Sequence, residues 1–272
     1  MFKKYLDKLE FNSITNTLLK YSNTFVGQRI INGLEPYSDT ERVRRYLAET
    51  TEAVNLIHSF GALPISHFDD LSVPLKQIES SISISQKNLL EFANILKTSH
   101  DLKDFYSNSG IICENLQCYF DSLYQNDVIQ KKIYSSLISE DEVSDNASAK
   151  LASIRKSKKN LILEIRNRLN SIIHSNTYSK YLMESVITIR NDRFVIPVKD
   201  EYKNQVKGFI HDVSASGSTV YIEPMAVFEM NNAINSLSVE EDREIERILE
   251  ELSSLFYPIS SFINQNVNLI GK

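Results

Sequence analysis

RFVIPVKDEYKNQVKGFIHDVSASGSTVYIEP, residues 193–224, is the one long stretch of this sequence that predicts β-sheet. Its β-branched and aromatic residues come in short runs, which suit pleated strands. The segment SASGS at 214–218 predicts a turn in which Gly217 takes a positive φ. Together with the residues just before it, the stretch predicts a small antiparallel sheet of four strands, at 186–190, 193–198, 206–213 and 219–222.

Two long helical patterns flank this sheet. Apolar residues at three- and four-residue spacing predict one helix over about 146–175 and another that runs from Pro224, at its first position, to about 257. At 1.5 Å per residue these helices span about 45 Å and about 50 Å. A small sheet between two such arms is typical of a part that reaches out to touch a partner.

The two long helices carry opposite charge. Residues 150–180 contain eight basic residues and one acid, a net +7, whereas residues 223–251 contain nine acids and two arginines, a net −7. Narrow apolar seams with opposite flanking charges predict that the helices pair as an antiparallel coiled coil. Two interpretations of the charge stay open: it registers and solubilises the pair, or the basic helix also meets phosphate backbones.

The N-terminal part predicts a helical bundle. The expected helices cover residues 6–19, 25–32, 38–61, 85–106, 113–124 and 127–138. Their signals include Gly33 as a stop, a capping box that begins at Ser38, and Ser85 as an N-cap. Residues 62–74, with two prolines, predict a loop.

These patterns divide the chain into three parts and give a mainly α fold. The acidic segment EDEVSD at 140–145 predicts the first boundary. We expect a helical region at 1–145, a unit of long helix, small sheet and long helix at 146–257, and a return to the first region at 258–272.

Composition limits the class and the compartment. The 272 residues include 42% hydrophobic and 24% charged side chains, the ordinary balance of a soluble protein. No apolar run approaches the roughly 20 residues that a membrane span needs, and the N-terminus lacks the apolar segment of a signal peptide. We therefore expect a cytoplasmic protein with no membrane partner. Cys113 and Cys118 fit structural thiols in a reduced compartment.

Catalytic and metal-binding patterns are missing from the sequence. It contains no glycine-rich phosphate loop and no metal site of familiar spacing. The loop residues His67, Asp69 and Asp70 could be ligands, but a solvated loop is the favoured interpretation because no second His or Cys accompanies them. His211 and Asp212 lie beside three serines, yet neighbours on a strand point to opposite faces, which favours a turn over a catalytic triad. No catalytic or metal residue is predicted.

The sheet region offers basic and aromatic side chains without a net charge. Residues 183–222 contain five basic and five acidic residues. The basic ones are Arg190, Arg193, Lys199, Lys203 and Lys207. Charge alone therefore gives little support for nucleic-acid binding at the tip.

Residues 193–249 resemble the MutS family, specifically its bacterial type-two branch. The motifs that carry the resemblance are RFVIPVK at 193–199, GFIHD at 208–212, SASG at 214–217, YIEP at 221–224, the pair Asn231-Asn232, and a glutamate-rich helix at 240–249. The segment LEF at 9–11 and the helix expected to end near Gly61 are similar to the start of the same branch. Val213 stands where the family usually has Gln.

The resemblance implies a helical core and lever region that carries a clamp domain with a small sheet at its tip. Because the sequence stops at Lys272 without a phosphate loop, it looks like an N-terminal fragment without the ATPase and small MutS-related domains. It also starts at the core, so the mismatch-recognition and connector domains are not expected. The fragment itself is not expected to be an enzyme or to bind a cofactor. The full-length protein is expected to be a homodimeric ATPase that uses ATP and Mg²⁺, with a C-terminal nuclease-type domain.

The function implied is a clamp that grips branched DNA and suppresses recombination, or that grips collided ribosomes for their rescue. The first candidates for phosphate contact are the five basic residues of the sheet region. The second candidates lie on the basic helix: Arg155, Lys156, Lys158 and Lys159. The motif residues given a structural role are Pro197, Gly208, Gly217, Glu223, Pro224, Asn231 and Asn232. The alternatives are a purely structural lever and, third, a hydrolase that uses His211.

Overall fold

The computed structural model describes residue 6 and residues 8–272, which form two compact units. Unit 1 combines the chain up to Ser144 with Leu249–Lys272, and unit 2 is Asp145–Ile248. The first boundary therefore falls within the acidic segment at 140–145. The second lies inside a long helix, at Ile248 rather than at residue 257. The mainly α fold with a four-stranded antiparallel sheet is confirmed.

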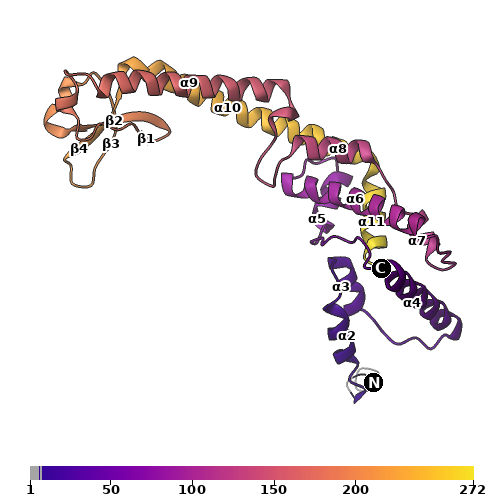
Figure 1. The fold of residues 1–272 in the computed structure, drawn as a ribbon. Helices are drawn as coiled ribbons and strands as arrows, with labels where there is room; N and C mark the ends of the chain where they lie inside the picture. The colour runs from indigo at the N-terminus through magenta and orange to yellow at the C-terminus, as the bar shows by residue number, and fades with distance from the viewer. Residues whose placement is uncertain (1–5, 7) are drawn as a thin grey trace. The chain divides into compact units, whose positions relative to one another are not determined.

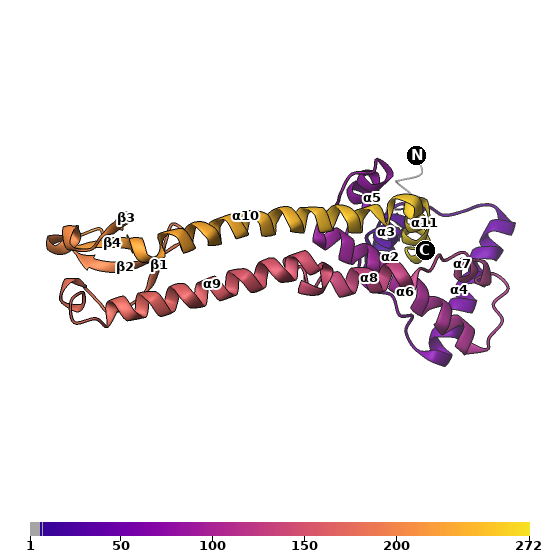
Figure 2. The same ribbon diagram turned by 90° about the horizontal axis from the view of Figure 1, so that it is seen from above.

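Unit 2 consists of two long helices and the sheet. Helix α9 (Ala149–Ile173) and the first part of α10 (Met225–Ser254) run antiparallel and side by side, as both Figure 1 and Figure 2 show. Short 3₁₀ turns, η1 (Asp145–Ala147), η2 (Ser179–Tyr181) and η3 (Asp200–Gln205), lie before and after α9 and within the sheet region. The predicted pairing of the arms is therefore present.

The sheet has the order β1-β2-β4-β3, with every neighbouring pair antiparallel. Its strands are β1 (Thr188–Arg190), β2 (Arg193–Lys199), β3 (Gly208–Val213) and β4 (Thr219–Pro224). One face packs on the end of α9 and the start of α10, where Ile165, Leu169, Ile196 and Ile222 join a single buried cluster. Burial of this apolar surface holds the sheet to the helices.

At two positions of the sheet region, the backbone geometry explains why the residue is glycine. A Cβ on Gly208 would collide with the backbone oxygen of Glu223, so only glycine allows β3 to approach β4 so closely. Gly217 takes φ +72° in the turn before β4, as predicted. Pro224 differs from the prediction: it is the last residue of β4, opposite Gly208, and α10 begins one residue later at Met225.

Unit 1 is mainly helical in its described part, with isolated β-bridges between Thr24 and Phe68 and between Leu137 and Val143. Its helices are α2 (Phe11–Leu19), α3 (Phe25–Asn32), α4 (Thr40–Phe60), α5 (Ser72–Glu79), α6 (Gln86–Ser109), α7 (Gln117–Asp121), α8 (Asp127–Ser136) and α11 (Ser260–Ile270). Helix α6 contributes eight buried residues, and its Phe92 is in edge-to-face contact with Phe256 at 5.3 Å between ring centroids. The amide of Asn266 bonds both the N–H and the C=O of Tyr124, which joins α11 to the start of α8.

Several helix ends match their sequence signals and others do not. Ser85 caps α6, and Gly33 and Gly61 follow the last residues of α3 and α4, as predicted. The N-cap of α4 is Asp39 rather than Ser38, because the Asp39 carboxylate accepts from the N–H groups of Glu41 and Arg42. The expected helix at 113–124 is shorter, since α7 covers only Gln117–Asp121.

Some local predictions need correction or fall partly outside the described residues. Helices α5 and α11 lie where no helix was predicted. The first turn of the helix expected at 6–19 includes residue 7, outside the described residues, and α2 starts only after Glu10, which has φ 56°. Cys113 is buried ahead of α7, and burial raises the pKa of its thiol, whereas Cys118 is exposed. No helix in the described part of the chain is long and apolar enough to cross a membrane.

Candidate nucleic-acid interface

The basic helix α9 is anchored at its first turn by a buried carboxylate of α10. Ser148, the N-cap, accepts from the N–H of Leu151 at 2.9 Å, and its hydroxyl donates to Glu244 Oε1 at 2.8 Å. The Glu244 side chain is only 2% exposed. Hydrogen bonds from Arg247, and then from Ser148, outweigh burial and lower the pKa of Glu244 from 4.5 to about 2. Glu244 is therefore ionised at neutral pH and holds the two helices together.

Arg155 and Lys158 turn toward α10 rather than toward solvent. Both bond Glu241, Arg155 Nε at 2.8 Å and Lys158 Nζ at 3.0 Å, and Arg155 Nη1 also bonds Asp145 at 2.6 Å. Burial acts to raise the pKa of Glu241, but the hydrogen bonds from Arg155 and Lys158 prevail and lower it. The charges of these two candidates are therefore neutralised by ion pairs within unit 2. This agrees with the interpretation in which the opposite charges of the two helices set their register.

A face of α9 next to Arg155 and Lys158 presents cations that have no carboxylate partner among the described residues. Lys156, Lys159, Leu163 and Arg166 follow one another at spacings of three and four residues, which places them on one face of the helix. All four are exposed, and within the described residues none of the three cations forms an ion pair. From Lys156 to Arg166 this face extends about 15 Å along the helix. We call these four residues the α9 basic face.

A shallow groove lies beside the α9 basic face. Its lining residues are Arg155, Lys158, Lys159, Ile162, Leu163, Arg166 and Glu241. The lining therefore combines the paired cations Arg155 and Lys158 with apolar side chains and with Lys159 and Arg166 of the basic face. Arg166 was counted in the charge of this helix but not proposed as a candidate, although its three-residue spacing from Leu163 was visible in the sequence.

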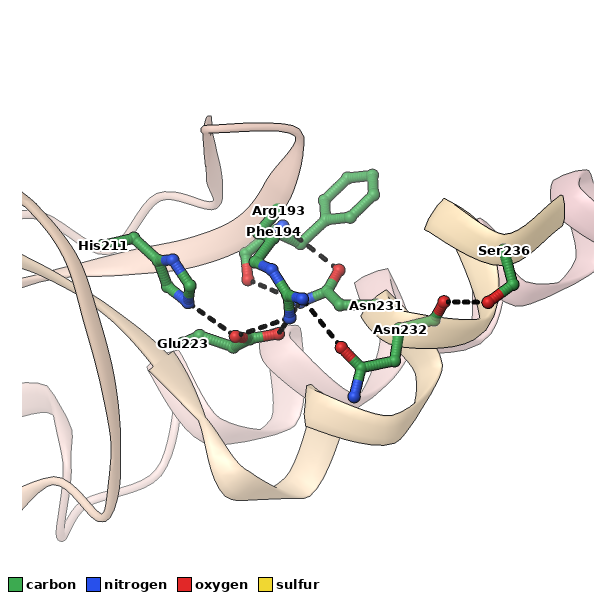
Figure 3. Close-up of polar contacts among 7 residues, drawn as sticks. All are labelled: Arg193, Phe194, His211, Glu223, Asn231, Asn232 and Ser236. Atoms are coloured by element: carbon green, nitrogen blue, oxygen red, sulfur yellow. Dashed lines mark hydrogen bonds and ion pairs between the residues drawn. The ribbon is translucent and has the colours of Figure 1, made fainter. Parts of the chain in front are cut away.

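Arg193, a first-rank candidate from the sequence, is enclosed in a polar network at the base of the sheet (Figure 3). Its guanidinium donates to both oxygens of Glu223, at 2.9 and 3.0 Å, and to Asn232 Oδ1 at 2.7 Å. The Glu223 side chain is 0% exposed and that of Arg193 is 19% exposed. An arginine fork held this way has few donors left for a phosphate.

Glu223 is the centre of that network. Besides Arg193 it accepts from His211 Nε2 at 2.6 Å and from the Asn231 amide at 2.6 Å. Asn231 also bonds both the N–H and the C=O of Phe194, each at 3.2 Å. Figure 3 shows these side chains converging from β2, β3, β4 and the first turns of α10. The contacts of Glu223, Asn231 and Asn232 therefore join the sheet to the helix.

Two more tip candidates have local carboxylate partners. Arg190 Nε lies 3.1 Å from Asp212 Oδ2, and its guanidinium stacks over the ring of Tyr221. Lys203 Nζ lies 2.8 Å from Asp200 Oδ1. These pairs are roughly half exposed, so water and salt screen them and a stronger anion can compete.

Lys199 and Lys207 are the tip candidates without a carboxylate partner among the described residues. Lys207 is exposed and comes just before β3. Lys199 donates to the carbonyl oxygen of Lys180 at 3.4 Å and lies over the ring of Tyr202. The five tip candidates are thus not one continuous basic surface. The sequence could count their charges but could not show which ones have partners.

The geometry around His211 does not assemble a nucleophile. His211 Nε2 faces Glu223, while the hydroxyls of Ser214, Ser216 and Ser218 bond one another in the turn. Asp212, its neighbour, points to Arg190. The turn interpretation therefore describes these serines.

Metal-ligating side chains do not cluster in the described part of the chain, where no group of three or more His, Cys, Asp or Glu could hold a metal ion. In the loop after α4, His67 Nδ1 lies 2.8 Å from the carbonyl oxygen of Asn23, and its Nε2 lies 3.3 Å from Asp69. Asp69 also pairs with Lys87 at 2.9 Å. These contacts leave the His67 loop with ordinary surface bonding.

Comparison with known proteins gives one consistent group. No protein-family model matches the chain. A protein named Endonuclease MutS2 from Acetivibrio thermocellus is 39% identical over 279 residues, covering 100% of this chain and 35% of that protein. Proteins of the same name from Clostridioides difficile and Finegoldia magna are 38% and 40% identical, covering 100% and 98% of this chain and 35% and 34% of their own lengths. The chain spans about a third of the length of these relatives.

Proposed function

Because the chain belongs to the MutS2 branch of the MutS family, we propose that its unit 2 grips nucleic-acid backbones. The α9 basic face is the main contact, and Lys199 and Lys207 assist at the tip. One observation carries this proposal: Lys156, Lys159 and Arg166 are exposed on one helix face without ion pairs in the described part of the chain, whereas their neighbours Arg155 and Lys158 are neutralised.

The spacing of that face suits a phosphate backbone. Along one strand of a duplex, phosphates succeed each other about 3.4 Å apart on the helix axis, so a face of about 15 Å faces several of them. The exposed acids Asp242 and Glu246 of α10 repel phosphate, which favours approach from the side of α9. A duplex bound this way contributes charge but no sequence information.

Two sources supply such a backbone: branched DNA, whose gripping would limit recombination, and ribosomal RNA in collided ribosomes, whose gripping would precede rescue. In this proposal the gripping part is unit 2. ATP, Mg²⁺, dimer contacts and any nuclease activity belong to the two thirds of the relatives' length that the chain does not cover. The chain would then supply the grip and not the motor.

The test is a salt titration. Labelled forked DNA and purified ribosomes are each mixed with the chain and with a variant in which Lys156, Lys159 and Arg166 are changed to Gln. Removing three phosphate contacts should lower the slope of log affinity against log salt by about 2 to 3. A variant with Lys97, Lys131 and Lys132 changed to Gln, exposed lysines of unit 1, removes the same charge elsewhere and should retain the slope.

The results also separate the sources and the rival function. Retained slopes in both variants, or equal losses in both, would overturn the α9 contact. A purely structural lever is the alternative, and the ion pairs of Arg155 and Lys158 across the arms favour it. It predicts that wild-type chain binds neither probe at low salt. Preference for forked DNA or for ribosomes would name the source.

A further inference from the structure

Three tyrosines come together where α9 ends and the sheet begins. The rings of Tyr178 and Tyr181 meet edge to face with centroids 6.2 Å apart, and Tyr181 and Tyr202 lie 5.2 Å apart. Tyr181 comes from η2 and Tyr202 from η3, so residues about twenty positions apart in the chain form one aromatic surface. The sequence does not show that these rings meet, because the fold alone brings them together.

Each ring packs against apolar side chains on one side and has solvent near its hydroxyl. All three are half-buried and pack against the apolar cluster of the sheet. In the described part of the chain, the buried side-chain polar atoms that lack a partner belong to Glu91 and Thr188. Since no hydrogen bond from the Tyr181 or Tyr202 hydroxyl to another described residue is present, these hydroxyls reach water. Such rings are rigid platforms that lose little conformational entropy when a ligand stacks on them.

Two lysines stand over these rings. Lys180 Nζ lies 5.1 Å from the ring centroid of Tyr181, and Lys199 Nζ lies 5.9 Å from that of Tyr202. Within the described residues neither lysine forms an ion pair. Each ammonium group therefore lies on a ring face of the tyrosines next to it. We call the three tyrosines with Lys180 and Lys199 the tyrosine–lysine cluster.

The acids nearby do not cancel this charge. Asp200 is paired with Lys203 at 2.8 Å, and Glu201 is exposed without an ion pair among the described residues. Counting Lys180, Lys199 and Lys203 against Asp200 and Glu201 leaves one positive charge, next to an apolar stacking surface. That combination suits a ligand with a flat apolar ring and a neighbouring negative charge.

We propose that the tyrosine–lysine cluster binds an unpaired nucleotide, with its base stacked on Tyr181 or Tyr202 and its phosphate paired with Lys180 or Lys199. Every base has a π-face, so stacking of this kind does not depend on sequence. A base inside a duplex is covered by its neighbours and cannot use these rings. The cluster therefore selects the single-stranded part of a branched structure, while the α9 basic face holds a duplex backbone.

This inference rests on the proposed grip of nucleic acid and adds a preference for unpaired bases. The required chemistry is present at a DNA fork and in a single-stranded loop of RNA. Binding is therefore measured with three fluorescent probes: short oligo(dT), short oligo(U) and a blunt DNA duplex. The proteins are the full chain and its variants Tyr202→Leu, Tyr202→Phe, Tyr181→Leu and Tyr181→Phe.

The Leu variants keep an apolar side chain but remove the ring, and the Phe variants keep the ring. Each Leu variant should bind the single-stranded probes about tenfold more weakly, as expected for the loss of one stacked base. Each Phe variant should bind them within about twofold of wild type, because stacking needs the ring and not the hydroxyl. Duplex binding should not change in any variant. Tyr21→Leu, at a tyrosine that is 80% exposed in unit 1, is the matched control.

The outcomes distinguish the two proposals. If the duplex binds and the single strands do not, or if Leu variants bind single strands as wild type does, the cluster is not a nucleotide site and the grip on duplex stands. If Phe variants lose as much as Leu variants, stacking is not the cause and the inference fails. If no probe binds, both proposals fail. Tighter binding of oligo(dT) or of oligo(U) identifies DNA or RNA as the source.

Discussion

Arg193 at the base of the sheet and Lys159 in the middle of α9 carry the same charge within the same unit, but their surroundings differ. Arg193 is 19% exposed and bonds Glu223 and Asn232, whereas Lys159 is exposed and has no ion pair among the described residues. The family motif points to Arg193, and the charge of the helix points to Lys159. The difference teaches that a basic residue in a motif can have a structural role, while in the function we propose phosphate contact belongs to a less distinctive stretch of the sequence.

The largest expected effect comes from removing the centre of the Arg193 network. Glu223→Ala leaves Arg193 without its buried counter-ion and His211 without its hydrogen-bond partner, and we expect unit 2 to lose about 3 kcal/mol of unfolding free energy. Native-state hydrogen exchange of the β2 and β4 amides measures this locally. Glu229→Ala, which removes an exposed glutamate of the same helix, is the control. Equal exchange in the two variants would show that the network does not stabilise the sheet.

The next largest effect should come from changing Glu244, the α10 carboxylate that bonds the N-cap of α9. Glu244→Gln loses charge-assisted hydrogen bonds from Ser148 and Arg247, and we expect a loss of about 2 kcal/mol at neutral pH. Urea unfolding followed by circular dichroism measures it. Glu246→Gln, an exposed neighbour on the same helix, should change the midpoint little.

The same glutamate gives a pH dependence of known sign. The folded pKa of Glu244 is about 2, below its usual 4.5, so its contribution is fully present above pH 4.5 and is lost as the pH falls toward 2. Urea midpoints measured across this acid range should fall more steeply for wild type than for Glu244→Gln. Parallel curves would mean that Glu244 keeps an ordinary pKa in the folded chain.

A smaller effect is expected when Arg193 is replaced by lysine, which has the same charge but lacks the planar guanidinium group. Arg193→Lys cannot bond Glu223 and Asn232 together, and we expect a loss of about 1 kcal/mol in unfolding free energy. Affinity for forked DNA should stay within about twofold if Arg193 acts only within the fold. A stable variant with much weaker DNA binding would instead make Arg193 a phosphate contact and reverse the comparison.

The smallest expected effect on stability is at the α9 basic face. Lys159→Gln removes an exposed side chain without an ion pair in the described part of the chain, so unfolding free energy should change by less than about 0.5 kcal/mol. Its DNA affinity should nevertheless fall measurably at low salt. Calorimetry and fluorescence anisotropy on the same sample make the two measurements. A destabilised variant would mean that Lys159 has a structural role like that of Arg193.

Local patterns were sufficient for the strands and for many helix ends. The short β-branched runs and the SASGS turn predicted all four strands of the sheet, because alternation and turn chemistry act over a few residues. The opposite charges of the long helices predicted their pairing. Helix α5 was not predicted, because it is only eight residues long and has Pro74 in its first turn, so its sequence pattern resembled that of a loop. The start of α4 moved by one residue because Asp39 competes with Ser38 for the same N–H groups.

The sequence by itself determined the mainly α class, the sheet between two long arms, and the charge that each arm carries. Those properties arise from spacing and composition, which one chain displays without any contact. Only the tertiary structure decided which cations are paired with a carboxylate. Glu223 bonds Arg193, thirty positions away in the sequence, and Glu241 bonds Arg155, eighty-six positions away. It also decided that Tyr181 meets Tyr202. Pairings between distant residues depend on how helices and strands pack, and linear spacing holds no record of that.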